Sequence, residues 1–119
     1  MDELKKNNAI ALLKKLAIEE SVMSYQEFAK RLGINKAPVI KTVTSFLEQL
    51  MIEDIKYNRP ILASVVVQKG PSAMPRQGFF QLLNTLNILS DVDDMAAIKA
   101  WHACECQKLK EYLSRESNE

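Results

Sequence analysis

His102, Cys104 and Cys106 are side chains whose types and spacing could bind a metal or act in nucleophilic catalysis. On a helix, His102 and Cys106 would share one face because they lie four residues apart. The 119-residue chain has one histidine and two cysteines, too few to complete a closed zinc site. Groups this close on one rigid helix also lack a third group that orients the base, and no oxyanion loop is apparent. We therefore expect a non-catalytic protein without metal or cofactor, in which His102 packs beside Trp101.

A second set of side chains has the types that contact nucleic acid. Residues 24–78 carry eight basic and four acidic side chains, a net charge of +4, whereas residues 1–23 are neutral and residues 79–119 carry −3. A polyanion would therefore bind the middle of the chain. Lysine and arginine neutralise phosphates, and Asn35 or Thr42 could meet base edges. The candidate DNA-binding residues are Ser24, Tyr25, Gln26, Asn35, Lys36, Lys41, Thr42, Ser45, Arg59, Lys69 and Arg76.

Five helices and one strand are predicted to position these side chains. Apolar residues at helical spacing predict helices over residues 3–20, 25–32, 37 to about 54, 77–87 and 90 to about 115. Ser24 and Ser90 are the expected N-caps of the second and last helices, and Gly33 ends the second. The β-branched stretch 61–68 predicts a strand. Its partner is either residues 21–24 or residues 73–76, and the sequence does not choose between them.

Three helices with a glycine turn between the second and third, followed by a strand, are typical of a winged helix-turn-helix. We therefore predict a mainly α fold with a short β wing. The chain is short enough to form a single domain, 1–119, with a winged-helix core at 1–70. Two additional C-terminal helices form an extension at 76–116.

Residues 24–33 read Ser-Tyr-Gln-Glu-Phe-Ala-Lys-Arg-Leu-Gly. This segment resembles the Thr-Tyr-Gly-x-(Ile/Leu)-Ala-x-x-(Ile/Leu)-Gly segment in the C-terminal winged-helix domain of the alkylguanine DNA alkyltransferases and alkyltransferase-like proteins. Residues 37–43 fall where the family has its Ala-Ala-Arg-Ala-Val-Gly recognition-helix motif. The resemblance covers about residues 22–70. It implies that Tyr25 works at the target phosphate and that the third helix meets DNA.

Two departures bear on what this resemblance implies. Val39 occupies the position of the family's arginine finger. Residues 59–63, Arg-Pro-Ile-Leu-Ala, replace the Pro-Cys-His-Arg motif that supplies the alkyl acceptor. The resemblance therefore implies DNA binding on a widely reused scaffold without alkyl transfer.

The sequence leaves two functions open. The first is non-catalytic binding of double-stranded DNA by a small regulator, with the third helix in the major groove. The alternative is a protein-interaction module or inhibitor, for example of a phage or mobile element, that holds a protein partner or a second copy through residues 79–113. No apolar run reaches the about 18 residues of a membrane-spanning helix, and the cysteines are poorly spaced for a disulfide. We expect a cytoplasmic protein that makes no membrane contact.

Overall fold

The computed structural model describes residues 2–71 and 73–117, and it is mainly helical. In chain order the elements are α1 (Glu3–Ile18), β1 (Met23–Ser24), α2 (Tyr25–Arg31), α3 (Val39–Lys56), the 3-10 helix η1 (Leu62–Val65), β2 (Val66–Val67), α4 (Gln77–Thr85) and α5 (Met95–Ser117). All five predicted α-helices are present. None of the helices in the described part of the chain is long and apolar enough to cross a membrane.

The boundaries of α2 follow from its caps, as predicted. The Ser24 hydroxyl accepts a hydrogen bond from the Glu27 N–H at 3.1 Å, which satisfies a free donor of the first turn. At the other end Gly33 has φ +72° and its N–H donates to the Lys30 carbonyl, while the Ile34 N–H donates to the Ala29 carbonyl. This pair of bonds is a Schellman motif, and glycine adopts its left-handed conformation at low cost.

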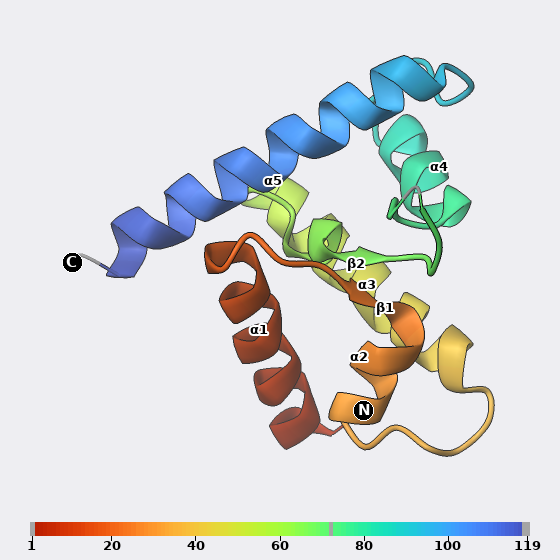
Figure 1. Ribbon diagram of the computed structural model, residues 1–119, viewed down its shortest axis with the longest axis vertical. Helices are drawn as coiled ribbons and strands as arrows, with labels where there is room; N and C mark the ends of the chain where they lie inside the picture. Colours follow the sequence, from red (N-terminus) through yellow and green to blue (C-terminus); the bar gives the residue numbers. More distant parts are fainter. Residues whose placement is uncertain (1, 72, 118–119) are drawn as a thin grey trace.

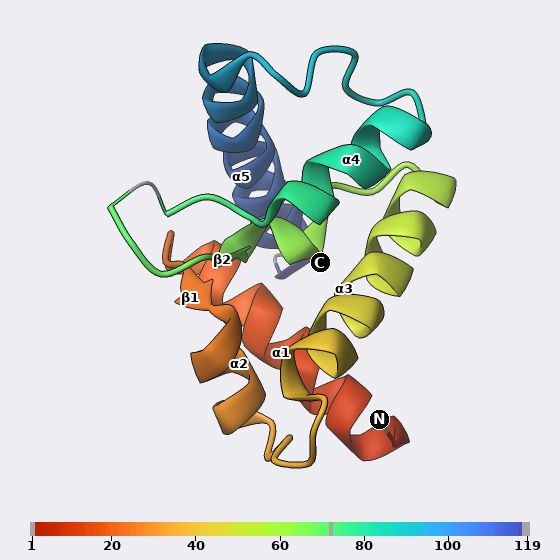
Figure 2. The same ribbon diagram turned by 90° about the vertical axis from the view of Figure 1, so that its right-hand side faces the viewer.

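The connection between α2 and α3 is longer than a tight helix-turn-helix turn. After Gly33 five more residues precede α3, which begins at Val39 with Pro38 as its N-cap. The Pro38 carbonyl accepts bonds from the Thr42 N–H at 3.1 Å and from the Thr42 hydroxyl at 2.7 Å. The loop 32–38 therefore separates the two helices and exposes residues 35–38 at one end of the molecule (Figure 2).

The predicted strand over residues 61–68 is wrong for its first half. Residues 62–65 form η1, and β2 contains two residues. The cause is tertiary: the Glu105 carboxylate accepts the Ile61 N–H at 2.9 Å, and the Asp54 carboxylate accepts the Leu62 N–H at 3.1 Å. These side chains supply the acceptors that a strand would have found in a neighbouring strand, so local β propensity is overridden.

The strand β2 pairs with β1, which lies just before α2. The pairing is parallel, with Met23 opposite Val66 and Ser24 opposite Val67. Of the two partners that the sequence left open, residues 21–24 therefore supply the strand. A wing would pair antiparallel strands, so the winged topology is not confirmed. One further backbone bond, from the Gln68 N–H to the Met74 carbonyl at 2.9 Å, closes the turn after β2.

The last helix begins later than its sequence suggests. The expected cap Ser90 lies outside the helix, and α5 begins at Met95. The Asp94 carboxylate accepts the N–H groups of Ala96 and Ala97 at 3.0 and 3.2 Å, so Asp94 caps the helix instead. Ser90 is held elsewhere, because its carbonyl accepts a bond from the Asn84 side chain at the end of α4.

The core lies around the segment 61–67, every residue of which is buried. The helix α5 crosses one side of the molecule and packs on α1 and on η1, as Figure 1 shows. Phe28, Leu13, Met51, Leu83 and Leu109 are among the largest fully buried side chains, and they come from all five α-helices. Each contributes roughly 1.5–3 kcal/mol by its removal from water. Through this core α3 packs against α2 and η1.

Candidate nucleic-acid interface

A shallow hollow of about 450 Å³ lies between α1 and the first half of α3. It brings together three of the predicted contacts, Lys41, Thr42 and Ser45. The Thr42 hydroxyl donates its proton to the Pro38 carbonyl, so toward a ligand it can act as an acceptor only. The hollow is lined by Lys6, Pro38, Lys41, Thr42, Ser45, Phe46 and Gln49, a set that contains no carboxylate.

A second hollow, of about 250 Å³, lies between α2 and the turn after β2. It brings together the predicted residues Ser24, Gln26 and Lys69 with Lys30 and Glu27 of α2, and the Glu27 carboxylate accepts from the Arg31 guanidinium at 3.2 Å. Val39 lines this hollow and the preceding Pro38 lines the first one, so the two hollows flank the first turn of α3. The exposed loop residues Asn35 and Lys36 lie in the chain just before that turn.

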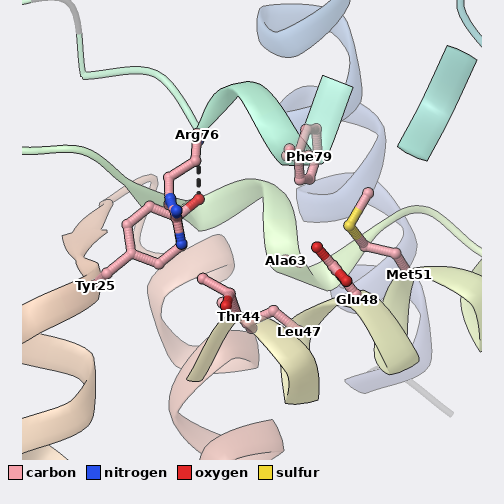
Figure 3. A pocket seen from close by; sticks show the side chains of 9 residues that line it. Tyr25, Thr44, Leu47, Glu48, Met51, Ala63, Arg76 and Phe79 are labelled. Atoms are coloured by element: carbon pink, nitrogen blue, oxygen red, sulfur yellow. Dashed lines mark hydrogen bonds between the residues drawn. The ribbon is translucent and has the colours of Figure 1, made fainter. Parts of the chain in front are cut away.

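Tyr25 and Arg76 meet at a smaller pocket of about 130 Å³ between α2, α3 and the start of α4 (Figure 3). The Tyr25 hydroxyl accepts the Arg76 backbone N–H at 3.0 Å, and the Arg76 guanidinium lies 5.8 Å from the centre of the Tyr25 ring. Tyr25 is only 8% exposed, and burial raises its pKa. Its hydroxyl therefore stays protonated and can still donate that proton.

The rest of this pocket is lined by both apolar and polar side chains. Leu47 and Met51 from α3 and Phe79 from α4 are the apolar ones, while Thr44 and Glu48 project from α3. The volume is smaller than the roughly 300 Å³ at which small-molecule sites usually begin. The pocket can accept a small polar group through the Tyr25 hydroxyl and the Glu48 carboxylate.

Arg59 is not brought to the start of α3. Its guanidinium donates to the Asp54 carboxylate at 3.1 Å and to the Glu53 carboxylate at 3.3 Å. It lines a different hollow, beside Lys14 of α1 and Glu116 of α5. Asp54 is 4% exposed, and burial raises its pKa despite the nearby arginine. The charge of Arg59 is therefore balanced within the fold.

His102 and Cys106 lie together, but their geometry does not activate the thiol. The His102 Nε2 atom is 2.7 Å from the Ser64 carbonyl, which can only accept, so this nitrogen carries a proton. The Cys106 Sγ atom is 3.6 Å from the same nitrogen, which cannot also take the thiol proton. Burial raises the pKa of Cys106 to about 11. Among the described residues no group of three or more His, Cys, Asp or Glu side chains is arranged to hold a metal.

The aromatic residues Phe79, Phe80 and Trp101 of the C-terminal helices pack against one another. The Trp101 ring centre lies 5.8 Å from that of Phe79 and 6.4 Å from that of Phe80, both at steep angles. In the described part of residues 79–113, the exposed large apolar side chains are Ile88 and Met95, at 43% and 55%. Within residues 79–113 the exposed apolar side chains therefore lie at the α4–α5 loop, while Trp101 is half-buried.

Sequence reasoning missed several residues that line the hollows. Lys6 lies in residues 1–23, which are neutral as a group, and Lys30 lies in the basic segment but outside the predicted contacts. Gln49 lies seven residues after Thr42, a spacing that returns to one helix face, so the sequence did carry a signal for it. The position of Lys6 depends on how α1 packs, which no local pattern indicates.

Comparison of the chain with known protein families, with characterised protein sequences and with solved structures found no match.

Proposed function

We propose that this protein binds double-stranded DNA without catalysis, with the first half of α3 in the major groove and lysines around it on the phosphates. One observation carries the proposal. Lysines from α1, α2, the loop 32–38, α3 and the turn after β2 surround the first turn of α3, and in the described part of the chain none of them forms an ion pair. They are Lys6, Lys30, Lys36, Lys41 and Lys69.

The geometry of α3 suits insertion into a groove. Lys41, Ser45 and Gln49 lie at intervals of four residues, and all three are exposed. Side chains at this spacing share one helix face, which an α-helix presents to base edges in the major groove. Glutamine pairs with adenine through two hydrogen bonds, and a serine hydroxyl can contact any base. In this arrangement Lys41 contacts a phosphate at the start of the helix.

The winged helix-turn-helix remains part of this proposal. The turn after β2, closed by the bond from Gln68 to Met74, takes the place of the wing and carries Lys69. The resemblance to the alkyltransferase winged-helix domain places Tyr25 near a phosphate. Here Tyr25 is buried, so the half-buried Arg76 beside it would make that contact. A small regulator without an enzymatic activity is the role that fits.

Binding to a mixed-sequence duplex tests the proposal directly. We expect micromolar or tighter affinity at low salt, measured by fluorescence anisotropy, and a steep loss as salt rises because phosphate contacts release counterions. Lys41→Glu should weaken binding at least tenfold. Lys99→Glu is the matched control, since Lys99 is exposed on α5 away from both hollows. Absence of binding at low salt would contradict the proposal.

A protein partner or a second copy is the other candidate, and the exposed Ile88 and Met95 favour it. Both flank a loop that carries Asp91 and Asp93, so the surface combines apolar and acidic groups. Sedimentation equilibrium tests the second copy. A mass that rises with concentration and returns to 13.5 kDa in Ile88→Asp would support self-association through this loop.

A further inference from the structure

The first turns of α1 are fastened to the loop that leads into α3. The Lys5 ammonium group donates to the Gly33 carbonyl at 3.3 Å, across 28 residues of sequence. Gly33 lies two residues after the end of α2, so this bond joins α1 to the loop between α2 and α3. Figure 2 shows the start of α1 near the lower end of α3, and Lys6 and Pro38 line the same hollow. The next residue along α1, Lys6, lines the hollow.

The hollow has the composition of a phosphate-binding surface. Lys6 from α1 and Lys41 from α3 line it together, and the neutral groups between them are the hydroxyls of Thr42 and Ser45 and the Gln49 amide. Asp2 accepts the Lys5 N–H at 2.8 Å and caps α1, while Glu3 and Glu48 are close in sequence to the hollow but do not line it. Two cations contributed by different helices, with no carboxylate among the residues that line the hollow, suit an anion that carries several oxygens.

We infer that the α1–α3 hollow is a phosphodiester site in which Lys6 and Lys41 contact the backbone of one DNA strand, an inference that rests on the proposed DNA binding. The helix α1 is then part of the nucleic-acid interface and not only support for the core. The contacted strand runs along the α1 side of α3, while Lys30 and Lys69 on the other side contact the opposite strand of the groove. Lys6 fixes where α3 sits in the groove and carries no base specificity.

Two lysines of α1 make a matched pair for the test. Lys6 and Lys15 are nine residues apart, which at about 100° per residue puts them on opposite sides of the same helix. Lys15 is exposed and lines neither hollow. The change to glutamine removes the same charge from the same helix in both cases. Lys6→Arg keeps the charge and tests whether a cation alone is sufficient.

The measurement is the slope of log affinity against log salt for the duplex. Lys6→Gln should reduce the slope by about 0.9 and weaken binding about eightfold at 0.1 M salt, as expected for one lost phosphate contact. Lys15→Gln and Lys6→Arg should match the wild type, and thermal unfolding should show all four proteins equally folded. If the wild type binds while Lys6→Gln and Lys15→Gln behave alike, the phosphodiester site is overturned and the proposed function stands. If the wild type does not bind, both are overturned.

Chemical acetylation of lysines, followed by mass spectrometry, separates a DNA site from a site for free phosphate. Duplex DNA should protect Lys6 and Lys41 and leave Lys15 reactive. Inorganic phosphate at the same total phosphate concentration should protect none of the three. Equal protection by inorganic phosphate would overturn a site for the nucleic-acid backbone.

Discussion

The surroundings of α3's first turn and of η1 use charged side chains in opposite ways. Around η1, Asp54 and Glu105 are buried, and their carboxylates accept hydrogen bonds from backbone N–H groups. The Asp54 carboxylate also accepts one from Arg59. Around the first turn of α3, the lysines make no ion pair in the described structure. Charges of the first kind hold the fold together, whereas charges of the second kind remain available to a partner.

This contrast shows which charged side chains can contribute to a binding surface. A charge that the fold already neutralises, such as that of Arg59, adds nothing to a binding surface even though it lies in the basic segment. Net charge by segment counts Arg59 and Lys41 equally. Substitutions at η1 should therefore change the free energy of unfolding without changing DNA affinity, and substitutions at the start of α3 should do the reverse.

The largest expected effect is on stability, from Asp54→Ala. This change leaves the Leu62 N–H without its acceptor in the core and removes one of the two carboxylates that hold Arg59. We expect the free energy of unfolding to fall by about 3 kcal/mol, within the range for a broken buried polar network. Urea unfolding followed by circular dichroism measures it. Under conditions where the variant is folded, its affinity for the duplex should match that of the wild type, and a large loss of affinity would break the contrast.

The next effect is on binding, from the double variant Lys30→Glu, Lys69→Glu. Both side chains are exposed and line the hollow between α2 and the turn after β2. Reversing two charges that contact phosphates should weaken duplex binding at 0.1 M salt about a hundredfold, or roughly 2.7 kcal/mol. The free energy of unfolding should change by less than about 0.5 kcal/mol, as for other surface substitutions. A matched pair, Lys108→Glu with Lys99→Glu on α5, should leave binding intact.

The sequence predicted the helices well because their signals are local. Ser24 and Gly33 both act as caps of α2, and apolar spacing is a property of each helix alone. The strand over residues 61–68 failed because the acceptors that shape η1 come from Asp54 and Glu105, of which Glu105 lies 44 residues from Ile61 along the chain. No pattern within the segment contains that information.

The candidate interface was predictable in part, for the same reason. Lys41, Thr42 and Ser45 lie on one helix, and helical spacing alone brings them together. Lys6 could be found only from the packing of α1 against the loop 32–38. Only the structure excludes Arg59 from the candidate interface, because it places Glu53 and Asp54 beside its guanidinium.

The smallest expected effects come from serine-to-alanine substitutions, one beside η1 and one at the start of α3. Ser64 is fully buried at 0% exposed, and its hydroxyl has no hydrogen-bond partner among the described residues, although its carbonyl accepts from His102. A buried hydroxyl without a partner costs about 1–3 kcal/mol, so Ser64→Ala should raise the free energy of unfolding by about 1 kcal/mol once lost packing is included. Ser45 is exposed at the hollow, so Ser45→Ala should leave stability within about 0.5 kcal/mol and weaken duplex binding a few fold. Urea unfolding and anisotropy on both variants give four numbers. If Ser64→Ala is destabilising, the hydroxyl contributes to the fold, and the surroundings of η1 satisfy their polar groups more completely than the geometry shows.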